Sequence, residues 1–266
     1  MKKRKNLLCI LLLIFSIAVF IAYLQYEKAT NDKIAPVLSC ENDTITASVS
    51  ITEEEMLQGV TAQDNKDGDV SHTIVVESIS NFVDTNKRVI TYAAIDNDMN
   101  VGRIERFLVY SDYEAPTFSL TRPLSYVVGS RINILENVRA TSVLDGNVTP
   151  KLRYGLSSMI DNLTSGSYPV EFRVTDSCGQ TSYLNTEIEI YESTFSGIDV
   201  YLKKYLTYIP KGSKFNPDAY FKSSTIEGEL SIVNPVDTKT PGTYAVDYYV
   251  NATNAAGKSR LIVVVY

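Results

Sequence analysis

Short runs in which apolar and polar residues alternate recur from about residue 34 to the end of the chain. The clearest alternating positions are Ile90, Tyr92 and Ala94, then Val170, Phe172 and Val174, and finally Tyr248, Val250 and Ala252. Alternation with a period of two is typical of a β-strand with one buried face. Each run is followed by a polar corner and a second apolar run, which ends at Tyr110, Tyr191 or Tyr266. The pattern therefore predicts strand, tight corner and strand three times, about 80 residues apart.

Two polar motifs repeat in phase with these strands. The corner is framed by Asp96 and Asn100 in the first copy, by Asp176 and Gln180 in the second, and by Asn254 and Lys258 in the third. The sequence DGDV at residues 67–70 returns as DGNV at 145–148 and more loosely as EGEL at 227–230. An acidic residue followed by glycine predicts a turn, because glycine adopts positive φ at little steric cost. The repetition indicates three domains of about 80 residues, each large enough for a modest core.

The rest of each repeat also indicates strands. Runs rich in Val, Ile, Tyr and Thr, such as residues 72–80 and 186–192, are separated by turn residues, and no long amphipathic helix pattern is present. Residues 51–60 are the exception, with Thr52 and Glu55 spaced as a helix-capping box, and predict one helical turn at most. We therefore expect an all-β protein whose repeats are β-sandwiches of mainly antiparallel sheets.

The N-terminus has a different character. Four basic residues at positions 2–5 precede residues 7–24, which contain no charged side chain. A helix of 18 residues spans about 27 Å at about 1.5 Å per residue, close to the thickness of a hydrocarbon core of about 30 Å. We expect a single-pass, uncleaved membrane anchor with its N-terminus in the cytoplasm and the domains outside. The alternative is a cleaved signal peptide that releases a secreted adhesin, although no good cleavage site is present near residue 22.

These patterns define the expected domain boundaries. They are a cytoplasmic basic tail (1–6), a transmembrane signal anchor (7–24), a polar stalk (25–33) and three repeats (34–112, 113–192 and 193–266). Ala35-Pro36 opens the first repeat and Ala115-Pro116 opens the second. The third repeat has no such opening and is the most divergent of the three.

The opening Ala-Pro, the DGDV turn and the strand leading into an Asp-x-x-Gly-Asn type of corner resemble the bacterial immunoglobulin-like repeat. That family occurs in tandem in Gram-positive surface proteins and in pesticidal crystal proteins. The resemblance covers residues 34–192 well and 193–266 loosely, and it departs at Met99, where the family favours glycine. It implies three tandem immunoglobulin-like β-sandwiches at a cell surface, used as spacers or binding modules, with no catalytic residues to transfer.

Composition narrows the function further. The net charge is −6, and an acidic body disfavours nucleic-acid binding, which needs clustered Lys and Arg. The three cysteines are scattered over different segments and predict neither a disulfide framework nor a zinc site, and a bridge between Cys40 and Cys178 is not expected. His72 is the only histidine. On a strand it would point away from Ser71, so we expect no catalytic pair and no enzymatic activity.

Two sets of residues are candidates for binding. The first repeat concentrates oxygen ligands suited to calcium, at Asp64, Asp67, Asp69, Asp96, Asp98 and Asn100. The competing interpretation is that these side chains only form turns through their own hydrogen bonds. The third repeat is rich in tyrosine, and Tyr201, Tyr205, Tyr208 and Tyr220 would offer contact area to an extracellular protein or polysaccharide partner, or would simply form strands.

We therefore expect a non-catalytic, membrane-anchored bacterial surface protein whose domains act as a spacer and as an adhesion module. The alternative function is an accessory or scaffolding subunit that docks an envelope enzyme or transporter. No cofactor is expected, apart from the calcium that the first repeat could bind.

Overall fold

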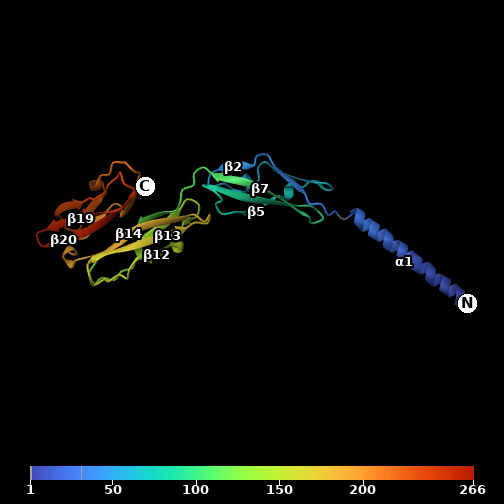
Figure 1. Cartoon of the computed structure of the whole chain (residues 1–266), viewed down its shortest axis with the longest axis horizontal. Helices are drawn as coiled ribbons and strands as arrows, with labels where there is room; N and C mark the ends of the chain where they lie inside the picture. The colour runs from blue at the N-terminus through green and yellow to red at the C-terminus, as the bar shows by residue number, and fades with distance from the viewer. Residues whose placement is uncertain (1, 31) are drawn as a thin grey trace. The chain divides into compact units, whose positions relative to one another are not determined.

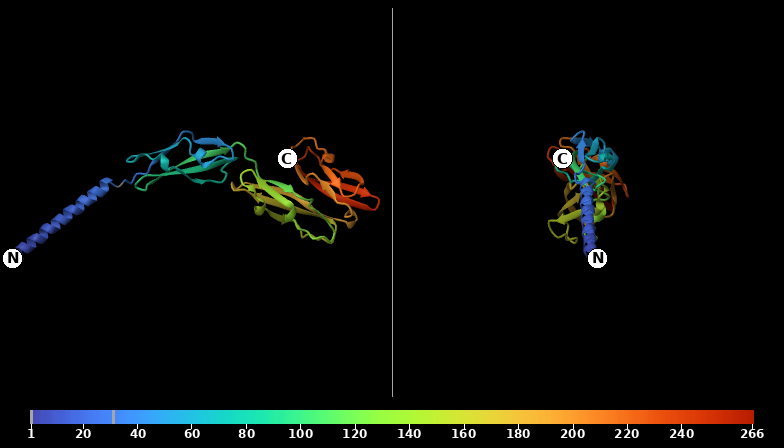
Figure 2. Two further views of the ribbon diagram at one scale, coloured as in Figure 1. Left: turned by 180° about the vertical axis from the view of Figure 1, so that it is seen from behind. Right: turned by 90° about the vertical axis from the view of Figure 1, so that its right-hand side faces the viewer.

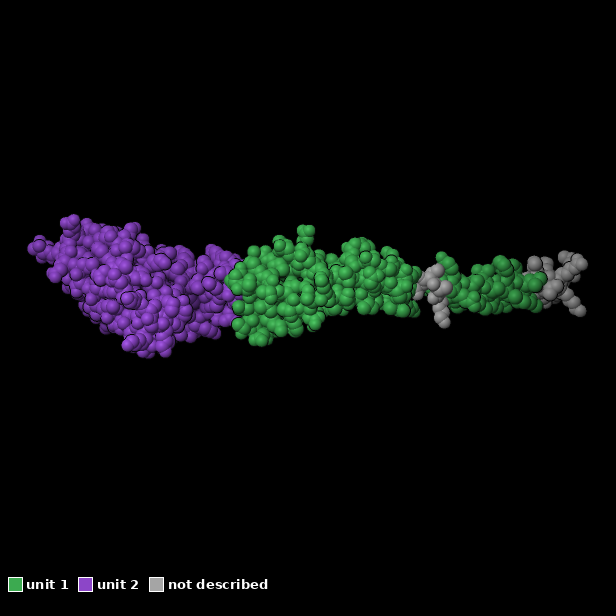
Figure 3. All heavy atoms as spheres, turned by 90° about the horizontal axis from the view of Figure 1, so that it is seen from above, with its two compact units in different colours: residues 1–112 green, residues 113–266 purple. Residues whose placement is uncertain are grey.

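The computed structural model describes residues 2–30 and 32–266, with side chains described for residues 10–27 and 32–266. The chain divides into two compact units, Met1–Asp112 and Tyr113–Tyr266 (Figure 3). The first unit contains one long helix and one β-sandwich, and the second contains two β-sandwiches (Figures 1 and 2). The predicted fold class is therefore confirmed: a mostly β chain of three immunoglobulin-like sandwiches follows one apolar N-terminal helix.

Helix α1 spans Lys2–Thr30 and is longer than predicted. The helix continues through residues 25–30, which the sequence analysis assigned to a polar stalk. No glycine or proline interrupts residues 2–30, and extending a formed helix adds one backbone hydrogen bond per residue, so the polar end continues the apolar segment. Within it, Ile10–Glu27 is long and apolar enough to cross a membrane, and none of it is buried in the structure.

The three repeats have closely similar strand orders. In the first, one sheet is ordered β1-β3-β4 and the other β2-β7-β6-β5. The strands of the first sheet are β1 (Val37–Cys40), β3 (Val60–Asp64) and β4 (Gly68–Asp69). Those of the second sheet are β2 (Thr44–Ala47), β7 (Val101–Tyr110), β6 (Lys87–Ile95) and β5 (Val75–Ile79).

The second and third repeats follow this order with small changes. The second has sheets β8-β10-β11 and β9-β14-β13-β12, and the third has β15-β17 and β16-β20-β19-β18. The strands of the second repeat are β8 (Thr117–Leu120), β9 (Ser125–Val127), β10 (Val138–Ser142), β11 (Gly146–Asn147), β12 (Arg153–Leu156), β13 (Gly166–Thr175) and β14 (Thr181–Tyr191). The strands of the third are β15 (Val200–Leu202), β16 (Leu206–Ile209), β17 (Phe221–Ser224), β18 (Glu229–Val233), β19 (Gly242–Ala252) and β20 (Ala255–Val265).

Each four-stranded sheet contains one parallel pair, which the expectation of mainly antiparallel sheets did not specify. The pairs are β2 with β7, β9 with β14 and β16 with β20. The chain enters each repeat in one sheet and then crosses to the edge of the other, beside the last strand of the repeat. This crossing puts the first and last strands side by side and closes one edge of each sandwich.

Short helical turns connect the strands. Helix α2 (Glu53–Met56) has the predicted capping box, in which the Thr52 hydroxyl accepts from the Glu55 backbone and the Glu55 carboxylate accepts from Thr52. Residues 71–73 form a 3-10 turn, η1 (Ser71–Thr73), so the strand predicted to begin at residue 72 begins at Val75 instead. The other 3-10 turns are η2 (Leu135–Asn137), η3 (Thr149–Lys151), η4 (Ser193–Phe195) and η5 (Pro217–Tyr220).

The predicted corner motif is correct in two repeats and wrong in the third. The Asp96 backbone N–H donates to the Asn100 carbonyl, and the Asp176 N–H donates to the Gln180 carbonyl in the same way. In the third repeat Ala252 pairs directly with Ala255, and Lys258 pairs with Tyr249 inside the ladder. A shorter hairpin replaces the corner there, so Lys258 is a strand residue and is not equivalent to Asn100.

The core of each sandwich comes from the alternating positions. In the first repeat, Ile90, Tyr92 and Leu108 are fully buried between the sheets. The Tyr92 hydroxyl donates to the Met56 carbonyl at 2.7 Å, which satisfies its buried polar group. In the second unit, Leu206 and Ile262 of the third repeat pack into the core cluster of the second repeat. The two C-terminal sandwiches therefore share apolar contacts.

Candidate functional site

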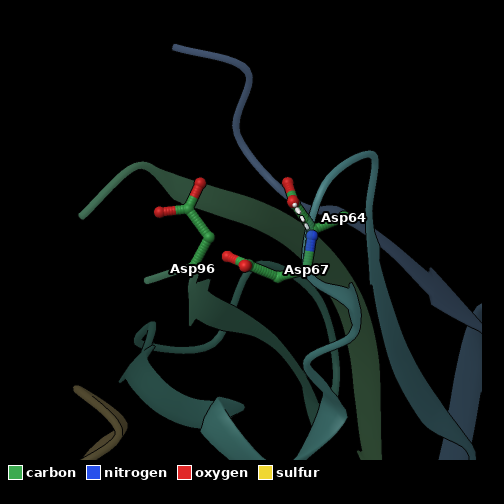
Figure 4. A group of neighbouring side chains, drawn as sticks. All are labelled: Asp64, Asp67 and Asp96. Carbon is green, nitrogen blue, oxygen red and sulfur yellow. Dashed lines mark hydrogen bonds between the residues drawn. The ribbon is translucent and has the colours of Figure 1, made fainter. Parts of the chain in front are cut away.

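Three of the predicted calcium ligands come together at one end of the first repeat. Asp64 ends strand β3, Asp67 lies in the turn before β4, and Asp96 follows the end of β6. One carboxylate oxygen from each of the three lies within 4.8 Å of the others. Figure 4 shows the carboxylate of Asp67 pointing toward Asp96, with that of Asp64 beside them. Segments about 30 residues apart in the sequence thus converge on one cluster of acids.

Hydrogen bonds from backbone groups hold these side chains in place. The Asp64 Oδ1 atom accepts from the backbone N–H groups of Lys66 and Asp67, each at 2.9 Å. The Asp67 Oδ2 atom accepts from the Asn97 N–H at 2.9 Å, which ties one loop to the other. These bonds confirm that the acids form turns, as one interpretation of the sequence expected.

Asp96 is held by the other end of its own corner. Its Oδ1 atom accepts from the backbone N–H of Asn100 and its Oδ2 atom from the Asn100 side-chain amide, both at 2.7 Å. Asn100 therefore lies next to the cluster and positions one of its carboxylates.

Asp64 has one oxygen that turn formation does not use. The residue is only 8% exposed, and its Oδ2 atom is buried without a hydrogen-bond partner. The backbone N–H groups of Asp67 and Lys66 lower the pKa of this carboxyl group below its ordinary value. Asp64 is therefore a carboxylate anion at neutral pH, and leaving one of its buried oxygens without a hydrogen-bond partner is costly.

The other predicted ligands lie at different distances from this cluster. Asp98 pairs with the Lys66 ammonium at 2.5 Å, and this hydrogen bond lowers the Asp98 pKa. Asp69 lies outside the three-carboxylate group and accepts from the Ser71 N–H at 2.9 Å. The six predicted residues therefore divide into three that cluster, two that adjoin them and one that forms a separate turn.

Sequence analysis missed two participants, Asp32 and Lys66. The Asp32 N–H donates to Asp98, its carbonyl accepts from the Asn100 amide, and its carboxylate accepts from Asn65. The sequence analysis placed Asp32 in the stalk. Its position two residues before Ile34, where the first repeat begins, was the one sequence feature that could have indicated a role in this loop cluster. Lys66 lies between two predicted ligands, and its basic charge excluded it from a search for oxygen ligands.

Only some of the four tyrosines predicted to form a binding surface are exposed. A groove of about 700 Å³ lies between β8 of the second repeat and β15–β16 of the third, and its lining includes Tyr201, Tyr205 and Tyr208. Tyr201 and Tyr208 are 43% and 37% exposed. Tyr205 packs against the core clusters of both sandwiches, so its role is structural.

Tyr220 does not line the groove. It packs against the Phe215 ring at 5.6 Å between centroids, and its hydroxyl lies 3.2 Å from the Thr207 hydroxyl. Three lysines, Lys203, Lys204 and Lys222, complete the groove lining. The surface available for binding therefore combines two tyrosine rings with ammonium groups, a combination that counting tyrosines did not predict.

An ion network between the second and third repeats was also missed. Lys258 pairs with Glu189 and with Asp247, the latter at 3.4 Å. Arg260 contacts Glu189 at 2.8 Å, Asp247 at 2.7 Å and Glu187 at 3.1 Å. Burial acts against the charged forms of both basic groups, but the adjacent carboxylates outweigh it, so the pKa values of Lys258 and Arg260 are raised. The network joins β14 of one sandwich to β19 and β20 of the other.

The remaining predicted features are in ordinary surroundings. Cys40 is a free thiol. The Ser71 hydroxyl accepts from the Ala62 N–H at 2.9 Å, and His72 lies beside it in η1 rather than on a strand. The geometric reason given for dismissing a Ser–His pair was therefore wrong, although the Ser71 hydroxyl is engaged with the backbone.

Comparison with known proteins gives distant similarities. No protein-family model matches the chain. An uncharacterized 81.3 kDa protein of Acholeplasma phage L2 is 24% identical over 235 residues, covering 82% of this chain and 30% of that protein. The chain thus spans less than a third of the length of this curated relative.

The similarities to solved structures are equally distant. A Clostridium perfringens ZmpB structure, with the M60 catalytic domain and two CBM51 domains, matches 88% of this chain and 43% of its own, at 11% identity and a TM-score of 0.28. The EC22–24 fragment of mouse cadherin-23 matches 87% of this chain and 99% of its own, at 13% identity and a TM-score of 0.22. At these TM-scores the immunoglobulin-like assignment rests on the strand order of the three repeats themselves.

Proposed function

We propose that the chain is a single-pass surface protein of the bacterial immunoglobulin-like repeat type, which presents three sandwiches outside the membrane without catalysing a reaction. The observation that carries this proposal is helix α1. Its large apolar side chains from Ile10 to Leu24 are exposed. Eleven of the residues in 10–24 are Leu, Ile, Val or Phe. At about 0.3–0.6 kcal/mol each, inserting them into a bilayer is favourable by about 3–7 kcal/mol.

The charge distribution supports one orientation. Basic residues occupy positions 2–5, and positive flanks remain in the cytoplasm, which puts the sandwiches on the outer side. The experiment is protease digestion of intact cells that carry a C-terminally tagged chain. We expect the sandwiches to be digested only from outside, and a variant with glutamate at positions 2–5 to show reduced accessibility. Full protection of the wild-type sandwiches in intact cells would contradict the orientation.

The binding role is proposed for the groove lined by Tyr201, Tyr208 and Lys222, with an extracellular protein or polysaccharide as partner. Exposed tyrosine rings offer a rigid apolar face with a polar tip, and they lose little conformational entropy on binding. The groove lies at the junction of two sandwiches that share core contacts, so its walls are preorganised.

Point substitutions test this role better than a truncation. Removing residues 193–266 would uncover the apolar face of the second repeat that Leu206 and Ile262 cover. The truncated protein would then bind other proteins non-specifically through this exposed apolar surface. We expect Tyr201→Ser together with Lys222→Ser to reduce capture of the native partner from isolated envelopes. Tyr183→Ser, at a 58% exposed tyrosine on β14, is the matched control. Equal capture by both variants would remove the groove from the proposal.

A further inference from the structure

We propose that the end of the first repeat is a calcium site in which Asp64, Asp67 and Asp96 supply the carboxylate ligands. The site goes beyond the proposed surface role, because a chain without calcium could still act as a spacer. The inference rests on the position of Asp64, on the charge around it, and on the separation of the three oxygens.

The second repeat shows what the same loop needs when it only forms a turn. Strand β10 ends at Ser142, as β3 ends at Asp64. The Ser142 hydroxyl accepts from the N–H groups of Leu144 and Asp145, the same two bonds that the Asp64 Oδ1 atom accepts one repeat earlier. A hydroxyl is therefore sufficient for the turn. The turn accounts for one oxygen of Asp64 and leaves the buried Oδ2 atom unexplained.

The remaining acids of the second repeat also have protein donors. Asp176, which corresponds to Asp96, accepts from the Tyr113 hydroxyl at 2.5 Å. Asp145, which corresponds to Asp67, accepts from Lys151 at 3.2 Å and from Ser177. In the first repeat, the Asp64 Oδ2 atom is buried with no such donor, and one carboxylate oxygen of Asp64 lies within 4.8 Å of an oxygen of Asp67 and of Asp96. The second repeat is thus complete by itself, and the first has the form of a site for an external cation.

The local charge leads to the same conclusion. Five carboxylates, those of Asp32, Asp64, Asp67, Asp96 and Asp98, share this end of the sandwich with the ammonium of Lys66. The ammonium is hydrogen-bonded to Asp98 and not to Asp64. Clustered carboxylates repel one another unless a cation lies between them, and a divalent ion brings the largest compensating charge.

The separation of the oxygens fits a single calcium ion. Two ligands of one Ca²⁺ ion, each about 2.3–2.6 Å from it, lie at most about 5.2 Å apart. Mg²⁺ dehydrates reluctantly and usually binds proteins through one or two carboxylates, so three convergent carboxylates favour calcium. The three oxygens lie within 4.8 Å of one another, so one Ca²⁺ accepts this whole range without moving the backbone. Carbonyl groups and water would complete the coordination that calcium needs.

Calcium at this position would also act on the segment that enters the first repeat. Asp32 is held by Asp98 and Asn100, which lie in the same loop as Asp96. Fixing this loop would therefore hold the chain at the start of the sandwich. The expected consequence is a calcium-dependent loss of flexibility at residues 32–36.

The test is hydrogen–deuterium exchange on the full chain in uncharged detergent micelles. The protein is stripped with EGTA and then titrated with CaCl₂ to about 10 mM in buffered salt, because extracellular calcium modules have Kd values of about 0.1–1 mM. We expect saturable protection of residues 64–69 and 95–100, extending to 32–36, and at least tenfold weaker binding for Asp64→Ser. Ser142 shows that serine preserves the turn. Asp67→Asn gives a second variant, whose amide oxygen can still accept from Asn97.

Two substitutions serve as controls. Asp69→Asn, at the predicted ligand outside the cluster, and Asp145→Asn, in the second repeat, should both bind calcium like the wild type. The proposal is overturned if exchange does not change up to 10 mM calcium. It is equally overturned if Asp64→Ser titrates like the wild type, or if 10 mM MgCl₂ gives the same protection. None of these outcomes bears on membrane orientation or on partner capture, so the proposed function is tested separately.

Discussion

Removing the Lys258 ammonium should destabilise the second compact unit far more than a typical surface substitution. The Lys258 side chain is only 6% exposed and is paired with Glu189 and Asp247. Replacement by methionine keeps most of the volume and the apolar stem but leaves the Arg260 guanidinium as the one cation that contacts Glu187, Glu189 and Asp247 in this network. The second carboxylate oxygen of Glu189 is already buried without a hydrogen-bond partner, so no other group can compensate for the lost cation.

The expected size follows from the burial of the pair. Breaking a buried ion pair by removing one partner costs about 3–5 kcal/mol, whereas an exposed pair contributes about 0–1 kcal/mol. The unit from Tyr113 to Tyr266 has about 150 residues, and in this size range 1 kcal/mol shifts Tm by about 2–4 °C. Lys258→Met should therefore lower the Tm of the C-terminal transition by about 6–20 °C.

Calorimetry and urea unfolding of the full chain in micelles would measure this change. Glu187→Gln is the matched control, because Glu187 is the most exposed carboxylate of the network and should shift Tm by less than about 3 °C. The double variant Lys258→Met with Glu189→Gln should recover part of the loss, because it removes the uncompensated charge together with its partner. Since the pair is buried, 0.5 M NaCl should leave the difference between Lys258→Met and wild type nearly unchanged.

The reasoning is refuted if Lys258→Met and Glu187→Gln have the same midpoint. A second contradiction would be a double variant less stable than the sum of the two single changes. Either result would mean that water reaches the network and screens it, and that apolar contacts alone hold the two sandwiches together.

Three further predictions concern the first repeat. Tyr92→Phe leaves the buried Met56 carbonyl without its donor and should cost about 1–3 kcal/mol, measured by urea unfolding; an unchanged midpoint would contradict the buried bond. Met99 has φ of +69° and is 74% exposed, so Met99→Gly should relieve backbone strain and stabilise by up to about 1 kcal/mol, and a lower midpoint would be evidence against that strain. The folded pKa values of Asp64 and Asp98 lie below the ordinary value of 3.8. Ionisation of these two carboxyl groups therefore adds its full contribution to the free energy of unfolding above about pH 4, and this contribution is lost as pH falls through the folded pKa values. The urea midpoint should therefore drop on acidification, less steeply in Asp64→Ser, and equal slopes would count against this account.

Much of the fold could be predicted because the strands and turns of a β-sandwich are specified by residues close together in the sequence. The positions Ile90 and Tyr92 alternate with polar residues, and this period alone states that one face of the strand is buried. The glycine after Asp67 and the capping box at Thr52 determine backbone conformation through their immediate neighbours, and both were predicted correctly. The extent of α1 was underestimated, because a polar sequence was taken as a helix end although nothing in it interrupts the backbone hydrogen bonds.

The candidate site could be predicted only in part. Turn chemistry identified the two acidic loops, but several arrangements of their side chains satisfy the same sequence. Only the structure shows that Asp64 faces Asp67 and Asp96 while Asp69 belongs to another turn. The comparison with Ser142 then separates the oxygen that forms the turn from the oxygen that remains for a ligand, a distinction that depends on hydrogen-bond geometry.

The sequence by itself determined three sandwiches, their order after an apolar helix, and the local turns, because period-two patterning, glycine conformation and hydrophobic length act over a few residues. The tertiary structure alone decided that Lys258 and Arg260 lie between two sandwiches, that Tyr201 and Tyr208 line one groove, and that three aspartates share one space. A pattern of apolar residues indicates that one face of a strand is buried, but it does not indicate which other element packs on that face. Contacts between distant segments depend on how whole sheets pack, so their partners appear only once the sheets are in place.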